Sequence, residues 1–92
     1  MIREEDRKQI DKALDLIDQG KTHASFRELI FKCKRKPIRL AIRYSEFQAR
    51  LGMLQDSYIR QNNQERARHY YDCSQLMKEY MNEVNNDWGG KV

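Results

Sequence analysis

The sequence predicts an all-α fold, a single small four-helix domain built on a long antiparallel helical hairpin with helices at about 38–61 and 64–85. Three observations predict it. Apolar residues recur every three or four positions along most of the chain. One Pro and four Gly are too few for a turn-rich β fold. The 92 residues suffice for one domain, so we expect residues 1–85 to fold together and 86–92 to form a flexible tail.

The first helix is expected over residues 3–19. One face carries apolar side chains at helical spacing, namely Ile10, Ala13, Leu14 and Ile17. The acidic residues 4–6 occupy the first turn, where the helix dipole favours negative charge. Gly20 suits the left-handed conformation that commonly follows a helix end. Because the apolar face is narrow, this helix needs the rest of the domain to be stable.

The second helix is expected to begin between Thr22 and Ser25 and to end at Lys36. Ser25 and Glu28 have the spacing of a capping box, in which each side chain satisfies a free N–H group of the first turn. Its apolar face consists of Phe26, Leu29, Ile30 and Cys33. Pro37 stops this helix and suits the first position of the next one, because Pro restricts the preceding residue and lacks an N–H group.

The third helix carries a continuous heptad pattern. Its members step by four and three residues, through Leu40, Tyr44, Phe47, Leu51, Leu54 and Tyr58. A second apolar set lies on a different face and consists of Ile38, Ile42, Ala49 and Met53. A helix with two apolar faces is usually central, so we expect partners on both sides. Gly52 then marks a close crossing with another helix.

The fourth helix follows a turn at Asn62 and Asn63. Asn62 and Glu65 are spaced like a capping pair. The helix has its own heptad pattern, through Ala67, Tyr70, Ser74, Met77, Met81 and Val84. Two heptad patterns joined by so short a turn must pack antiparallel.

The hairpin contains one local resemblance. The run Leu54, Tyr58, Asn62, Ala67 and Tyr71 is similar to a single tetratricopeptide repeat, with Asn62 where that family usually has Gly. The match covers about a third of the chain, and no second copy occurs one period away. The resemblance implies a helical hairpin.

The sequence offers little for catalysis or metal binding. His69 and Cys73 lie one turn apart, and Cys33 and His23 could complete a set of four ligands, but paired metal-binding spacings are absent. A disulfide between Cys33 and Cys73 lacks any sign of an oxidising compartment. No phosphate-binding loop or nucleophile motif occurs. We therefore expect no metal, no cofactor and no enzymatic activity.

Positive charge is the strongest functional signal. The net charge of +4 divides into −2 for residues 1–20, +7 for 21–50 and −1 for 51–92. The candidate binding residues are the cations of the middle segment, Lys32, Lys34, Arg35, Lys36, Arg39, Arg43 and Arg50. Arg39, Arg43 and Arg50 share one stripe of the third helix and predict a basic ridge that attracts acidic proteins or phosphates.

Aromatic residues near the C-terminus are the second signal. Tyr80 and Trp88 belong to the residue types enriched at interfaces, and we expect them to anchor a partner. The alternative for Tyr80 is a second face of the fourth helix that the first helix covers.

Together these signals predict a non-enzymatic interaction protein, an adaptor, regulator or inhibitor that docks on a larger macromolecular partner. The preferred hypothesis is a protein partner with an acidic surface. The alternatives are an RNA- or DNA-binding protein that uses the basic segment 32–50, and a helical homodimer with a structural role. No apolar run reaches the roughly 18–20 residues of a membrane span, and the charged N-terminus does not resemble a signal peptide, so we expect a cytoplasmic protein.

Overall fold

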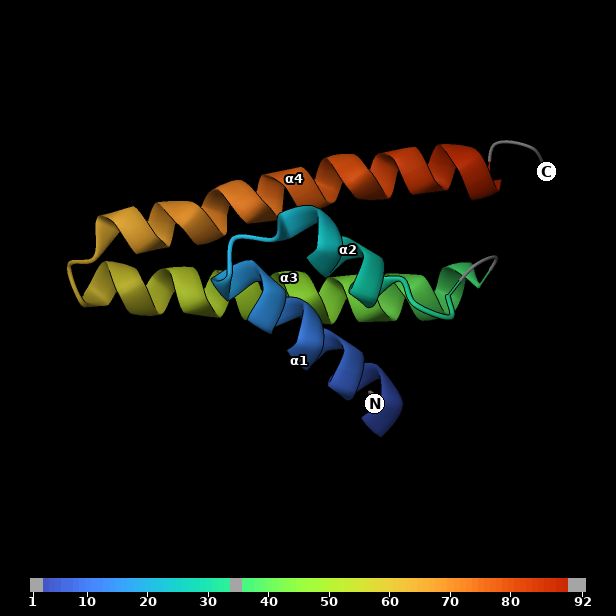
Figure 1. Cartoon of the computed structure of the whole chain (residues 1–92), viewed down its shortest axis with the longest axis horizontal. Helices are drawn as coiled ribbons and strands as arrows, with labels where there is room; N and C mark the ends of the chain where they lie inside the picture. Colours follow the sequence, from blue (N-terminus) through green and yellow to red (C-terminus); the bar gives the residue numbers. More distant parts are fainter. Residues whose placement is uncertain (1–2, 34–35, 90–92) are drawn as a thin grey trace.

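The described residues form four helices and no strand. The computed structural model describes residues 3–33 and 36–89. The helices are α1 (Glu4–Asp18), α2 (Thr22–Leu29), α3 (Pro37–Arg60) and α4 (Gln64–Gly89). Figure 1 shows α3 and α4 running side by side along the whole molecule, with α1 and α2 against one side of this pair. The predicted all-α fold with its long antiparallel hairpin is confirmed.

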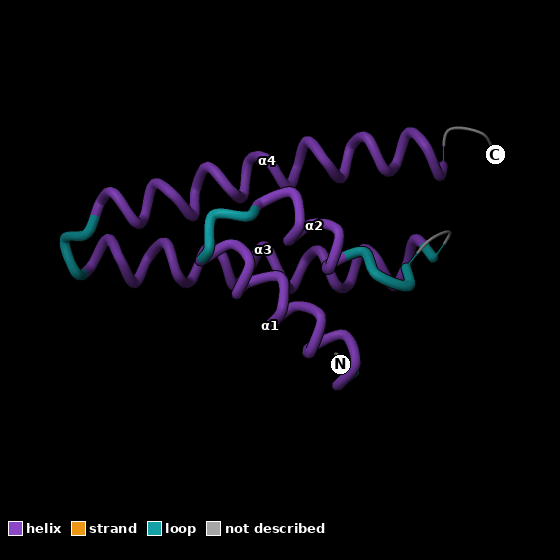
Figure 2. Tube along the Cα trace, viewed as in Figure 1, coloured by secondary structure: helices purple, strands orange, loops and turns teal. Residues whose placement is uncertain are grey.

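The α3–α4 hairpin buries the two predicted heptad patterns against each other. Leu40, Phe47 and Leu51 of α3 are buried, as are Tyr70 and Met77 of α4. Figure 2 shows how short the connecting turn is. Such close, continuous packing of long apolar faces supplies most of the stability of a small helical domain.

The turn uses its two asparagines differently from the prediction. Asn62 has a φ of 58°, a left-handed conformation that Asn tolerates better than most residues do. The side chain of Asn63 accepts a hydrogen bond from the backbone N–H of Arg66, at 3.2 Å. The capping residue of α4 is therefore Asn63, and the predicted pairing of Asn62 with Glu65 is wrong.

Helices α1 and α2 complete the core. Ile10, Ala13 and Ile17 are fully buried and belong to one cluster with Phe26 and Leu29 of α2. Gly20 has a φ of 78° and follows the end of α1, as its position in the sequence predicts.

Ser25 does not begin α2. It lies inside the helix, fully buried, and its hydroxyl donates a hydrogen bond to the carbonyl oxygen of Ala13 at 2.6 Å. The predicted capping box is wrong because this buried hydroxyl joins α2 to α1 instead of capping α2.

Two helix ends differ from the prediction. Helix α2 ends at Leu29 and not at Lys36. The chain then turns, and the carbonyl oxygens of Leu29 and Phe31 accept hydrogen bonds from the Arg43 guanidinium instead of helical N–H groups. Helix α4 continues to Gly89, so residues 86–89 extend the helix, and 90–92 lie outside the described residues.

The described residues leave the second apolar face of α3 largely exposed. Ile38 is 79% exposed, Met53 is 70% exposed and Ile42 is 46% exposed. A Cβ atom added at Gly52 would meet no described atom within 4 Å. The expectation of helices on both sides of α3, with a close crossing at Gly52, is therefore wrong within the described part of the chain.

Candidate docking surface on α3

Arg43, at the centre of the predicted basic ridge, is buried. Its side chain is 1% exposed. Its Nε and Nη2 donate hydrogen bonds to Oδ1 of Asp6 at 3.0 and 2.7 Å. Its Nη1 donates to the carbonyl oxygens of Leu29 and Phe31 at 2.7 and 2.8 Å. Arg43 therefore joins α1, α2 and α3 from the inside, which corrects the expectation that it faces a partner.

The other two arginines of the stripe are also paired with acids of α1. Nε of Arg39 donates to Asp6 at 3.1 Å, and its Nη2 lies 3.1 Å from Glu5 as an ion pair without a hydrogen bond to any described residue. Arg50 lies 3.5 Å from Asp11. The acidic face of α1 therefore neutralises much of the charge that the sequence concentrates in residues 21–50.

Asp6 is the centre of this ion-pair network. Burial alone would raise the pKa of this carboxyl group, but the hydrogen bonds and positive charges of Arg43 and Arg39 outweigh burial and lower the pKa below its ordinary value of 3.8. The carboxylate is therefore charged at neutral pH, although its side chain is 5% exposed.

The predicted lysines stand elsewhere. Lys32 is exposed, and its ammonium group lies 5.5 Å from the ring centre of Phe31. Lys36 is exposed where α3 begins. Lys34 and Arg35 lie outside the described residues. The continuous ridge from residue 32 to residue 50 is therefore absent among the described cations.

Of the two predicted aromatic anchors, Tyr80 is packed against other residues of the protein. The ring of Tyr80 packs against His23 and Phe26, with ring centres 5.5 and 5.2 Å apart, so Tyr80 belongs to the α2–α4 contact. The cover of this face of α4 is thus α2 and not the first helix. Trp88 falls within α4, but its side chain lies outside the described residues.

The geometry of the His69–Cys73 pair does not favour a nucleophilic thiol. Cys73 is buried, and burial raises the pKa of its thiol although Thr22 lowers it slightly by a hydrogen bond. Nε2 of His69 is 3.9 Å from that sulfur and 2.9 Å from the carbonyl oxygen of Ile17. A ring nitrogen that donates to a carbonyl cannot also accept a proton from the thiol. Both cysteines are free, and the described residues contain no cluster of three metal-ligating side chains.

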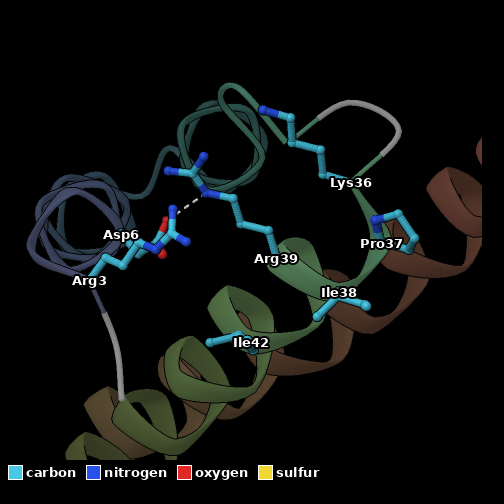
Figure 3. Close-up of a pocket in the computed structure, with 7 residues that line it drawn as sticks. All are labelled: Arg3, Asp6, Lys36, Pro37, Ile38, Arg39 and Ile42. Atoms are coloured by element: carbon cyan, nitrogen blue, oxygen red, sulfur yellow. Dashed lines mark hydrogen bonds and ion pairs between the residues drawn. The ribbon is translucent and has the colours of Figure 1, made fainter.

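A groove opens where α3 begins, beside the N-terminal end of α1. Its volume is about 380 Å³. Pro37, Ile38 and Ile42 form its apolar wall, and Arg3 and Lys36 line it together with the paired Asp6 and Arg39. Figure 3 shows Ile38 and Ile42 next to each other on α3, while Arg39 turns away from them toward Asp6. The groove thus combines exposed apolar side chains with cations that are not part of the buried network.

Lys36 and Arg39 are the predicted binding residues that line this groove, and its other lining residues were not predicted to bind. Ile38 and Ile42 had been assigned to a covered face, and Arg3 had been counted only as part of an acidic N-terminal segment. The available signal was their spacing, because Ile38, Ile42, Ala49 and Met53 need a covering face that a 92-residue chain with two other short helices cannot easily supply.

Comparison with known proteins identifies no relative, since no family model, curated protein or solved structure matches the chain. The resemblance of residues 51–71 to one tetratricopeptide repeat stays local. None of the described helices has a stretch long and apolar enough to cross a membrane.

Proposed function

We propose that this chain is a non-enzymatic interaction protein that docks on a larger protein partner through the groove at the start of α3. The single observation that carries the proposal is the exposure of Ile38 and Ile42 beside Lys36 and Arg3. Exposed large apolar side chains that adjoin one another and are rimmed by charge are typical of interaction sites. In this role the protein would act as an adaptor, regulator or inhibitor, by occupying a surface of its partner.

The chemistry of the groove defines the partner segment. Its apolar wall fits a leucine, methionine or aromatic side chain of the partner. Covering such an exposed isoleucine contributes on the order of 1–2 kcal/mol. Lys36 and Arg3 favour acidic residues next to that apolar side chain, and they also accelerate the encounter between the two proteins. We therefore expect an acidic, amphipathic segment of the partner in the groove.

A protein partner fits the groove better than a nucleic acid does. Direct binding of a phosphate backbone needs several free cations in a row. Arg39, Arg43 and Arg50 are instead held by Asp6, Glu5 and Asp11. What remains at the groove is a pair of cations around an apolar wall, which resembles the core and rim of a protein interface.

The test is site-specific photo-crosslinking in the source cells. A benzoylphenylalanine at Ile38 should capture one discrete protein, whereas the same group at Lys78, which is exposed on α4, should not. Capture from Ile38 should fall at least tenfold when Lys36 and Arg3 are both changed to Glu.

Two results would overturn the proposal. One is equal capture from Ile38 and Lys78. The other is binding of the purified protein to a mixed pool of RNA and DNA that persists at about 200 mM salt. Such binding would show that the protein binds nucleic acid directly.

A further inference from the structure

The uncovered face of α3 continues beyond the groove. Between Lys36 and Asp56 it contains no charged residue. Ile42 and Met53 are the large apolar side chains of this stretch, and the small residues between them, Ser45, Ala49 and Gly52, are all exposed. The stretch from Ile42 to Met53 is about 16 Å long at 1.5 Å per residue. An apolar stretch of this length on an otherwise charged chain requires an explanation of its own.

The Ile42–Met53 stretch is complementary to the same stretch of a second, antiparallel copy. In a two-fold symmetric pair, residue i of one copy contacts residue j of the other, and j contacts i. A two-fold axis near residue 48 sets Ile42 against Met53, and Ser45 against Gly52, of a second copy. Each large side chain then meets another large one, while the small residues at the centre allow the two backbones to approach closely.

The charges beside the stretch obey the same symmetry. Glu46 and Arg50 lie on the flank next to α1 and are also centred on residue 48. Within one chain they form an ion pair of 3.6 Å, and both side chains remain more than one-third exposed. In the reversed pair, Glu46 of each copy faces Arg50 of the other, twice. In a parallel symmetric pair the two flanks would lie on opposite sides of the interface, so these charges would not face each other.

We propose that a second copy of this chain covers the Ile42–Met53 stretch, with the two α3 helices antiparallel and crossing near residue 48. The crossing shares Ile42 with the docking groove, whereas the groove residues Arg3, Lys36 and Ile38 lie outside the crossing. One helix crossing falls at the small end of specific interfaces, so we expect dissociation in the micromolar range. The symmetry places the two grooves at opposite ends of the dimer, where each could hold a partner segment.

The first experiment is sedimentation velocity of the purified full chain from about 1 to 300 µM, a range that brackets micromolar dissociation. The wild type should change from monomer to dimer over this range. Ala49→Arg places two like charges near the axis and should weaken dimerisation at least tenfold. Gln75→Arg adds the same side chain at an exposed position of α4 and should leave it unchanged. Circular dichroism confirms that both variants are folded.

The second experiment tests the register by cross-linking. A mixture of Ile42→Cys and Met53→Cys should form disulfide-linked dimers between the two variants, and neither variant should do so alone. The wild type is the control, because Cys33 and Cys73 are buried. A parallel pair gives the opposite pattern, with each variant linking to itself.

A charge swap tests the two flanking pairs. Glu46→Arg and Arg50→Glu should each weaken self-association, and mixing the two variants should restore it through heterodimers. A monomer at every concentration, linking of each variant to itself, or equal effects of Ala49→Arg and Gln75→Arg would overturn the dimer. None of these results affects capture from Ile38, so the dimer and the docking function fail separately.

Discussion

Arg43 and Ile38 stand five residues apart on α3, and their environments are the reverse of what their chemistry suggests. Arg43 is charged and buried, while Ile38 is apolar and 79% exposed. Arg43 lies on the side of α3 that faces α1 and α2, where it donates hydrogen bonds to one carboxylate and two carbonyl oxygens. The opposite side supplies Ile38 with no described neighbour that covers it.

The comparison shows that whether a side chain of α3 is buried depends on the hydrogen-bonding partners around it more than on its hydrophobicity. A buried charge is costly unless its hydrogen-bonding groups are satisfied. Arg43 meets that condition because three of its nitrogen atoms donate to Asp6, Leu29 and Phe31. An exposed apolar side chain costs little in the monomer, so Ile38 can be retained for a contact outside the chain.

The largest expected effect on stability comes from removing the buried arginine. Arg43→Ala leaves the Asp6 carboxylate buried with only Arg39 beside it and frees two carbonyl groups. Removing one partner of a buried ion pair costs about 3–5 kcal/mol, which is a large part of the stability of a small domain. We expect the variant to be mostly unfolded, measured by urea denaturation followed by circular dichroism.

Arg50→Ala is the matched control for this loss. Arg50 belongs to the same stripe, but its ion pairs with Asp11 and Glu46 are exposed. Exposed pairs contribute less than about 1 kcal/mol. The double variant Asp6→Leu/Arg43→Met should recover part of the lost stability, because it removes both charges of the buried pair but leaves the carbonyl groups of Leu29 and Phe31 without Arg43. Equal losses for Arg43→Ala and Arg50→Ala would contradict the buried network.

The second prediction follows from the lowered pKa of Asp6. A carboxyl group whose pKa is lower in the folded state binds its proton more readily in the unfolded state. Its contribution to stability is therefore full above the ordinary value of 3.8 and is lost as the pH falls through the lower pKa of the folded state. We expect the wild type to lose stability as the pH falls below the ordinary value of 3.8.

Asp6→Asn isolates this effect. The variant should be less stable than the wild type at pH 7, and its free energy of unfolding should depend less on pH in the acid range. Urea midpoints at pH 7, 4 and 3 measure both differences. Parallel pH profiles for the two proteins would show that other carboxyl groups cause the acid loss.

Much of the fold was predictable because it depends on patterns along single helices. The heptad pattern from Leu40 to Tyr58 needs only the helical period, and the turn at Asn62 and Asn63 needs only the length of the connection. The same reasoning placed the left-handed residue at Gly20. The errors at Ser25 and at the end of α2 arose because a contact between helices replaces the local rule there.

The candidate site was predicted less well for the same reason. The sequence places Arg39, Arg43 and Arg50 on one stripe, but no local pattern tells whether that stripe meets solvent or an acidic helix. The ion pairs with Asp6 and Asp11 join positions more than thirty residues apart. The exposure of Ile38 likewise depends on how α1 and α2 divide the surface of the hairpin between them.

Gly52→Ala tests the exposed face of α3, and we expect it to change stability less than the substitutions of Arg43 and Asp6 do. The glycine lies inside a helix, and its added methyl group meets no described atom within 4 Å. Alanine loses less conformational freedom in a helix than glycine does, so we expect a gain of about 0.5–1 kcal/mol. Thermal unfolding at about 1 µM, where a micromolar dimer is mostly dissociated, measures the monomer. A loss of stability would mean that α3 is covered at this position within one chain.

The smallest expected effect is that of Ile38→Ser. Serine and isoleucine have similar helix propensities, and the side chain that is removed is mostly in solvent already. The free energy of unfolding should therefore change by less than about 0.5 kcal/mol, as for surface substitutions in general. Urea denaturation measures it, with Leu40→Ser, two positions along at a buried site, as the control that should unfold the domain. If Ile38→Ser proves as damaging as Leu40→Ser, then Ile38 is needed for folding and is not available to a partner. If Ile38→Ser leaves folding intact, then Ile38 is dispensable for stability and remains available to a partner, so the two faces of α3 contribute differently to the fold.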